Sequence, residues 1–103
     1  DTFEEVKPFY SDNSYAAVKK DGKWGFVDKE GKVIISPQYE EARSFSYGYA
    51  AVKKDGKWGF IDTSGKICIE PQFQNAMDMN SKGNMFVQEN DVWQLISLYR
   101  YNY

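Results

Sequence analysis

Acidic residues are the side chains of this 103-residue sequence whose types and spacing could support chemistry. Asp21 and Asp55 occupy equivalent places in an identical motif, and Asp28 and Asp62 follow that motif at the same distance. A catalytic site usually needs one asymmetric set of groups in different roles. Because these aspartates recur together, we interpret them as turn residues whose carboxylates accept backbone hydrogen bonds. We therefore assign no catalytic residue and expect no enzyme activity.

Histidine and cysteine open no other route to catalysis or metal binding. The sequence contains no histidine, which excludes an imidazole base or a His-ligated metal within this chain. Its one cysteine, Cys68, can form neither an internal disulfide nor a Cys-based zinc site. Cys68 sits in an apolar stretch without a histidine base, which indicates a packing role. No calcium-loop spacing of aspartates occurs, so we expect no metal and no cofactor.

The charge pattern favours neither a nucleic acid nor a membrane as partner. Thirteen basic and fifteen acidic residues give a net charge of −2, and no basic block stands out. The electrostatic attraction that dominates nucleic-acid binding would therefore be weak. The longest apolar runs have three or four residues, against about 20 for a membrane span. We expect no nucleic acid ligand and no membrane span.

Three tryptophans, Trp24, Trp58 and Trp93, are the candidate ligand-binding residues. In one interpretation each indole covers a gap left by the strand glycine beside it, Gly25 or Gly59. In the other, the indoles are equivalent platforms that stack on sugar rings or apolar peptide side chains. The periodicity of the aromatic residues favours packing between repeats. Aromatic residues outside the period remain available for binding: Tyr10, Tyr47 and the run from Tyr99 to Tyr103.

Internal repetition is the dominant feature of the chain. The sequence AAVKKDGKWGF occurs at 16–26 and again, 34 residues later, at 50–60; 18 of 34 positions match between 16–49 and 50–83. Residues 85–96 form a degenerate third copy offset by 35, and residues 3–6 resemble 39–42. We predict one repeat domain over 1–103. It comprises a trailing half-repeat (1–15), two repeats (16–49 and 50–84) and a degenerate terminal repeat (85–103).

Two turns divide each repeat into strands. An Asp-Gly pair predicts a type I′ hairpin turn, and a glycine nearby predicts a three-residue turn with a bulge. The turn residues are Asp21, Gly22 and Gly31 in the first copy and Asp55, Gly56 and Gly65 in the second. We expect Pro37 and Pro71 to end the third strand of each repeat. The fold class is then all-β, a tandem array of antiparallel three-stranded meanders with a period of 34–35 residues and little or no helix.

The predicted turns also fix which side chains share a face. One face of the first repeat would carry only apolar residues or glycine: Ala16, Val18, Gly25, Val27, Val33 and Ile35. On the other face, Lys19 would lie across from Trp24 and place its charge on the indole. We expect the connectors 37–49 and 71–84 to be extended or irregular, with at most one helical turn.

The motif Lys23-Trp24-Gly25-Phe26, with its second copy at 57–60, resembles the bacterial WG repeat family. The resemblance covers residues 3–96 and implies a β-rich repeat that serves as a structural or binding module. We therefore expect a protein–protein interaction or scaffolding module with an unidentified protein partner. The alternative is a carbohydrate or cell-wall binding module with one aromatic platform per repeat. The sequence does not determine a location, and we lean toward a bacterial surface or extracytoplasmic one.

Overall fold

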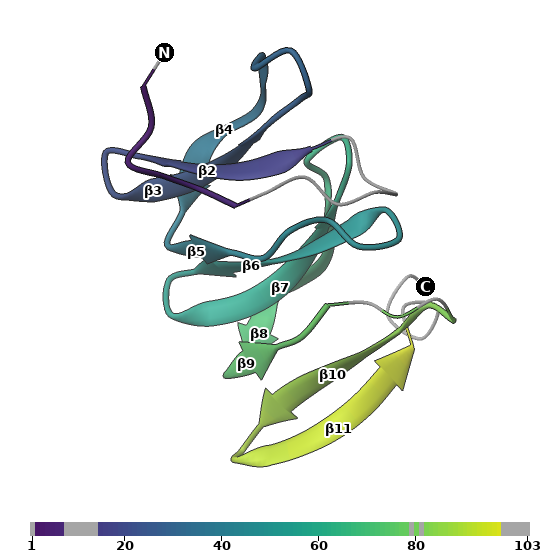
Figure 1. Cartoon of the computed structure of the whole chain (residues 1–103). Coiled ribbons are helices and arrows are strands. Elements are labelled where there is room, and N and C mark those ends of the chain that lie inside the picture. Colours follow the sequence, from purple (N-terminus) through teal and green to yellow (C-terminus); the bar gives the residue numbers. More distant parts are fainter. Residues whose placement is uncertain (1, 8–14, 79, 81, 98–103) are drawn as a thin grey trace.

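Three small antiparallel sheets, stacked in chain order, make up the molecule (Figure 1). The computed structural model describes residues 2–7, 15–78, 80 and 82–97. Within these ranges no helix occurs, so none of the described residues forms a membrane-spanning helix. Sheet A contains β1 (Glu5–Val6), β2 (Ala16–Lys20), β3 (Lys23–Val27) and β4 (Val33–Tyr39). Sheet B contains β5 (Glu41–Ala42), β6 (Tyr49–Lys54), β7 (Lys57–Asp62) and β8 (Ile67–Phe73). Sheet C contains β9 (Asn75–Ala76), β10 (Asn84–Glu89) and β11 (Val92–Ser97). The prediction of a tandem all-β fold is confirmed.

A two-residue turn closes the central hairpin of every sheet. Asp21 and Gly22 have φ angles of 52° and 78°, and Asp55 and Gly56 have φ angles of 52° and 81°. These left-handed values are what a type I′ turn requires at both central positions. In sheet C, Asn90 and Asp91 adopt φ angles of 53° and 65°, so the third copy keeps the turn without a glycine.

In a second type of turn, the side-chain oxygen of an aspartate or asparagine accepts backbone hydrogen bonds from the residues that follow it. The Oδ1 atom of Asp28 accepts hydrogen bonds from the backbone N–H groups of Glu30 and Lys32, both at 2.9 Å. Gly31 completes this loop with a φ of 85°. Asp62 plays the same part before β8, where Gly65 has a φ of 88°. The predicted role of both aspartates in turn geometry is confirmed.

The described residues of the connectors 37–49 and 71–84 form strands and turns without a helical turn. They supply the two-residue strands β5 and β9 to sheets B and C, and residues 5–6 supply β1 to sheet A in the same way, so sheets A and B have four strands rather than the three we predicted. After β5, Tyr47 and Gly48 make a further turn with φ angles of 52° and 88°. The corresponding turn before β10 runs from Asn80 to Asn84 and is one residue longer. This extra residue accounts for the change in spacing from 34 to 35.

The prediction that proline ends the third strand was wrong. β4 continues through Pro37 to Tyr39, and β8 continues through Pro71 to Phe73. The pairing of β3 with β4 shifts twice, so that Ile35 lies opposite Phe26 rather than opposite Gly25. β-Bulges of this kind accommodate a residue that cannot donate to the ladder. They also turn Ile35 to the face of Trp24 and Phe26, opposite to the predicted face.

Neighbouring sheets pack with the aromatic face of one against the small aliphatic face of the next. Between sheets A and B, the buried residues are Ala17, Trp24, Phe26, Ile35 and Tyr39 from sheet A, Ala42, Ala50, Val52 and Ile61 from sheet B, and Phe45. Between sheets B and C, they are Ala51, Trp58, Phe60, Ile69 and Phe73 from sheet B and Ala76, Met85, Val87 and Ile96 from sheet C. Because each interface joins two unlike faces, the sheets stack head to tail.

Candidate interaction surface on sheet C

The three tryptophans occupy equivalent strand positions but differ in exposure. Trp24 and Trp58 retain 7% and 5% of their accessible surface, whereas Trp93 retains 44%. The next sheet in the stack covers the first two indoles, and no sheet among the described residues follows sheet C. Only Trp93 is therefore accessible to a ligand, which does not fit the interpretation of one platform per repeat.

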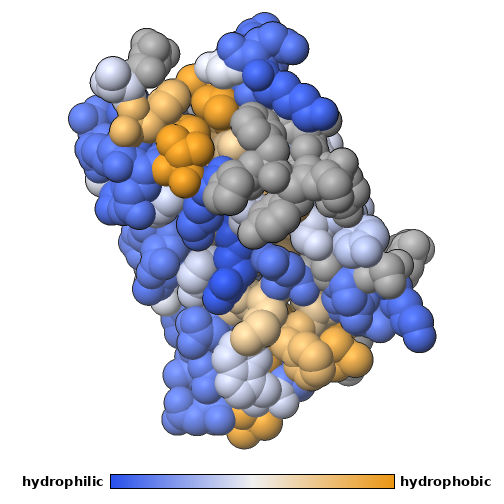
Figure 2. All heavy atoms as spheres, viewed as in Figure 1, coloured by the Kyte–Doolittle hydropathy of each residue, from blue (hydrophilic) through white to orange (hydrophobic). Residues whose placement is uncertain are grey.

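Phe86 and Leu95 lie beside Trp93 on the outer face of sheet C. Phe86 pairs with Leu95 across the β10–β11 ladder, and Trp93 pairs with Gln88. Phe86 and Leu95 are 49% and 51% exposed, although their counterparts in sheet B are fully buried. Figure 2 shows hydrophobic side chains gathered at the end of the molecule that β10 and β11 form. We call Phe86, Trp93 and Leu95 the terminal apolar face.

A basic side chain lies over each buried indole. The ammonium group of Lys7 lies 4.9 Å from the centroid of the Trp24 ring, and the guanidinium of Arg43 lies 5.4 Å from that of Trp58. Lys7 also donates to the carbonyl of Ala42 at 2.6 Å, which anchors it to the next sheet. We predicted that the charge of Lys19 would lie on the Trp24 ring, and this was wrong, because the cation over that ring is Lys7. Lys19 and Trp24 do pair across the β2–β3 ladder, as predicted.

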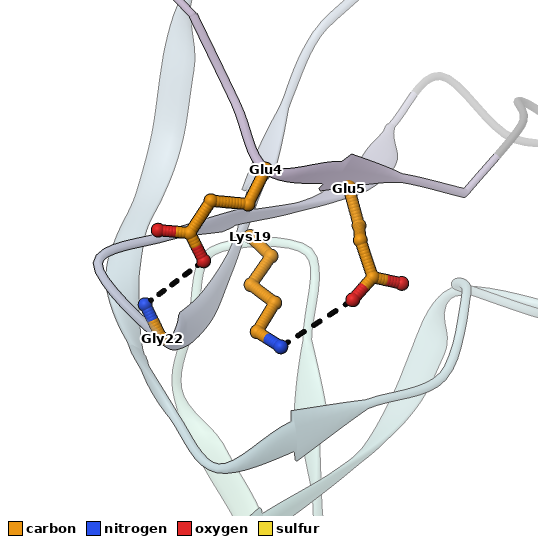
Figure 3. A network of polar contacts seen from close by, with 4 residues as sticks. All are labelled: Glu4, Glu5, Lys19 and Gly22. Atoms are coloured by element: carbon orange, nitrogen blue, oxygen red, sulfur yellow. Dashed lines mark hydrogen bonds and ion pairs between the residues drawn. The ribbon is translucent and has the colours of Figure 1, made fainter.

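The ammonium group of Lys19 instead forms an ion pair with an acidic residue of β1. Its ammonium group lies 3.3 Å from Glu5, while Glu4 accepts a hydrogen bond from the backbone N–H of Gly22 at 3.2 Å (Figure 3). The same two contacts recur one repeat later, where Lys53 faces Glu41 and Glu40 accepts from Gly56. The connector of each repeat thus fastens the hairpin beside it.

In sheet C, uncharged glutamine and asparagine side chains replace the glutamates and the lysine of these contacts. Asn75 donates to Gln88 at 2.9 Å where the earlier sheets have a Glu–Lys pair. Gln74 accepts a hydrogen bond from the backbone N–H of Asp91 at 2.6 Å, in the place of the glutamates that accept from Gly22 and Gly56 in sheets A and B. Met77 follows β9 where Arg43 follows β5, and it is 48% exposed. Among the residues that the structure describes, no cation therefore lies over Trp93 as Lys7 and Arg43 lie over Trp24 and Trp58.

The glycine after each buried tryptophan allows a close backbone approach. A Cβ atom on Gly25 would lie 2.7 Å from the nitrogen of Pro37, and one on Gly59 would lie 2.7 Å from that of Pro71. Neither contact leaves room for a side chain. Gln94 occupies this position in β11. Sheet C accordingly lacks a bulged third strand among the residues that the structure describes.

The described residues offer no arrangement suited to metal binding, because no three His, Cys, Asp or Glu side chains are grouped. Partial burial and the charge of Asp62 raise the pKa of the Cys68 thiol, although Lys66 acts in the opposite direction. A raised pKa keeps the thiol protonated and unreactive near neutral pH. Burial likewise raises the pKa of the Tyr39 hydroxyl.

The repeat is also identified by comparison with known families. The family model described as WG containing repeat matches three consecutive stretches, residues 2–24, 24–58 and 58–93. The chain belongs to the WG containing repeat family. Each matched stretch of this WG repeat chain ends at one of the three tryptophans described above. Neither a curated protein nor a solved structure matches the chain.

Some features of the WG repeat surface escaped prediction from the sequence. The cations over Trp24 and Trp58 were missed, although aligning residues 3–6 with 39–42 places Lys7 on Arg43. The exposure of Trp93 depends on whether a further sheet covers sheet C, which the repeat pattern alone does not specify. Tyr10 and the run from Tyr99 to Tyr103 lie outside the described residues. Tyr47, the remaining aromatic candidate, is 55% exposed in its turn and distant in the chain from the terminal apolar face.

Proposed function

We propose that this WG repeat chain is a non-catalytic protein–protein interaction module that binds its partner on the terminal apolar face. The supporting observation is the contrast between equivalent positions. Trp24 and Trp58 are buried by the next sheet, whereas Trp93 is 44% exposed beside two further large apolar side chains. Isolated apolar residues on a surface need no explanation, but a group of them is typical of an interaction site. Tryptophan is also enriched among the residues that dominate binding energy.

A single sugar-binding platform is the second candidate. Its support is that Trp93 lies opposite Gln88, whose amide could bind hydroxyl groups beside the ring. Phe86 and Leu95 favour the protein partner, because their exposed surface is apolar and offers no hydrogen-bonding group.

Selection of a displayed random-peptide library on the chain tests this proposal. The face variant carries Phe86→Ser, Trp93→Ser and Leu95→Ser, and the matched control is Val6→Ser, a 59% exposed position on sheet A at the opposite end of the stack. Both variants must keep the β-type circular dichroism of the parent. We expect apolar peptides that bind the parent and the control equally and bind the face variant at least about tenfold more weakly.

Peptides that bind the face variant as well as the parent would contradict the proposed surface. A glycan array supplies the comparison with the second candidate. Saturable glycan binding that is lost on Trp93→Ala, together with no selected peptide, would replace the protein partner by a sugar.

A further inference from the structure

The outer edge of β11 differs from the other sheet edges that the structure describes. Three edge strands, β1, β5 and β9, have only two residues each. The other two, β4 and β8, contain a proline and a shifted register. Short strands, prolines and bulges are the devices by which proteins prevent unwanted strand pairing. β11 has six residues, Val92–Ser97, with neither a proline nor a charged side chain, so it carries none of these devices.

In sheets A and B the corresponding edge carries a third strand. β3 pairs with β4, where Trp24 lies opposite Tyr39, and β7 pairs with β8, where Trp58 lies opposite Phe73. Sheet C follows the order β11-β10-β9, and within the described ranges no strand lies beyond β11. Among the described residues, no strand beside Trp93 fills the place that β4 and β8 fill in the other sheets.

The hairpin geometry determines which backbone groups face this edge. The turn at Asn90-Asp91 makes Glu89 and Val92 the first hydrogen-bonded pair of the ladder. Hydrogen-bonded and non-hydrogen-bonded pairs alternate along an antiparallel ladder. The N–H and C=O groups of Trp93 and Leu95 consequently point away from β10. Trp24 and Phe26, their equivalents in β3, likewise lie opposite residues of β4, namely Tyr39 and Ile35.

We infer that β11 accepts an extended strand of the protein partner, which adds to sheet C in the place that β4 and β8 occupy in the other sheets. This inference rests on the proposed function and specifies how its partner binds. The main-chain hydrogen bonds supply affinity, and alternate side chains supply specificity, as in other cases of strand addition.

The exposed residues of β11 define the chemistry of the incoming strand. Gly25 and Gly59 leave room for the bulged backbone at Pro37 and Pro71, and Gln94 stands at the equivalent position of β11. The incoming strand must therefore be regular, without a proline and its bulge next to Gln94. A regular antiparallel strand puts one side chain opposite Trp93 and the next but one opposite Leu95. In the other sheets, buried aromatic and aliphatic residues, among them Tyr39 and Ile35, line this side. The partner strand is therefore aromatic opposite Trp93 and aliphatic opposite Leu95.

A synthetic peptide that copies residues 31–39 with Pro37→Val has this pattern and serves as the probe. Its tyrosine would lie opposite Trp93 and its new valine opposite Leu95. Hydrogen exchange of individual amides in the intact chain is followed by NMR as peptide is added. We expect saturable binding that slows exchange at the amides of Trp93 and Leu95 about tenfold or more. The unsubstituted peptide, with its proline, should protect these amides less.

Two variants of one residue separate the edge from the face. Leu95→Pro removes an outward N–H group without removing a β10–β11 hydrogen bond, and Leu95→Ala keeps that group but shortens the side chain. We expect Leu95→Pro to bind the peptide about tenfold more weakly than Leu95→Ala. Equal binding by the two variants would overturn strand addition. If Leu95→Pro fails to fold, the exchange measurement on the parent decides.

The remaining outcomes each overturn the inference. They are the absence of peptide binding, protection confined to other amides such as those of Trp24 and Phe26, and protection of Trp93 and Leu95 without peptide in a self-associating chain. The last outcome would make a second copy the occupant of the edge. Selected peptides that require Phe86 and Trp93 but leave the β11 amides unprotected would overturn strand addition and leave the proposed function standing.

Discussion

Arg43 lies over the ring of Trp58 and at the same time reaches the following sheet. Its guanidinium carbon is 5.4 Å from the ring centroid, and its Nε atom donates to the carbonyl of Ala76 at 2.7 Å. Trp58 belongs to sheet B and Ala76 to sheet C. Lys7 makes the corresponding pair of contacts with Trp24 and Ala42 one unit earlier. One cation in each connector thus joins two neighbouring sheets.

Replacing Arg43 by alanine should destabilise the chain. The change removes the contact with the indole and leaves the carbonyl of Ala76 without its donor, so we expect the free energy of unfolding to fall by about 1–3 kcal/mol. Urea denaturation followed by circular dichroism measures the difference. Arg43→Lys is the control, because a lysine serves the preceding interface, and its loss should stay below about 1 kcal/mol. Equal losses in the two variants would mean that the positive charge is not what stabilises this junction.

Gly59→Ala should be among the most damaging single substitutions in the chain. The added Cβ atom would lie 2.7 Å from the nitrogen of Pro71 and close to the carbonyl of Ile69, both in the backbone of β8. We expect a loss of about 3 kcal/mol or more, measured by urea denaturation, because the backbone must shift. The matched control is Gln94→Ala at the equivalent position of sheet C, which should change stability by less than about 1 kcal/mol. A loss at Gly59 no larger than at Gln94 would rule out the close approach as its cause.

Tryptophan fluorescence should distinguish Trp93 from the other two indoles. Trp93→Phe should shift the emission of the chain toward the blue and remove most of its quenching by iodide, because the remaining indoles are 7% and 5% exposed. Trp24→Phe in the otherwise unchanged chain serves as the control and should leave the quenchable fraction in place. Strong iodide quenching in the folded Trp93→Phe variant would contradict the burial of Trp24 and Trp58.

Asp62 should contribute to the sensitivity of the chain to acid. Partial burial raises the pKa of its carboxyl, but hydrogen bonds from Ser64 and Lys66 and the charge of Lys66 outweigh this effect, so the pKa is lower than its ordinary value of 3.8. A carboxyl with a lowered folded-state pKa stabilises the fold above its unfolded-state pKa, and this stabilisation is lost as the pH falls through the folded-state value.

Asp62→Asn separates this titration from the geometry of the turn. Asn80 accepts backbone hydrogen bonds from the residues two and four positions later in a turn of the same type before β10, so asparagine should preserve the loop at neutral pH. Denaturation at pH 7 and at pH values below 4 should show a smaller acid-induced loss of stability in the variant than in the parent. An equal loss of unfolding free energy at acid pH in the two proteins would show that Asp62 does not contribute in this way.

Local sequence rules were sufficient for the turns and for the repeat. The φ angles at Asp21 and Gly22 are the ones that an Asp-Gly hairpin requires. Asp28 binds the backbone of its loop as an aspartate in a turn commonly does. Such features depend on a few consecutive residues, so the sequence around them carries the necessary information.

Features that depend on contacts between distant segments were not predicted. Pro37 satisfies the usual rule for ending a strand, but the bare backbone of Gly25 in the neighbouring strand provides room for a bulge and lets the strand continue. The resulting shift moved Ile35 to the other face. The contact between Lys7 and Trp24 likewise joins a connector strand to a hairpin far along the chain. Phe86 and Trp93 are exposed because nothing among the described residues covers them.

The head-to-tail packing has a consequence for how such a chain could evolve. Sheet B contacts an aromatic face on one side and presents an aromatic face on the other. A duplicated copy of residues 50–83, inserted directly after the original, would therefore meet neighbours of the kind for which it is already suited. Gene duplication could lengthen the molecule by whole units without creating a new type of contact, and the terminal apolar face would be carried outward unchanged.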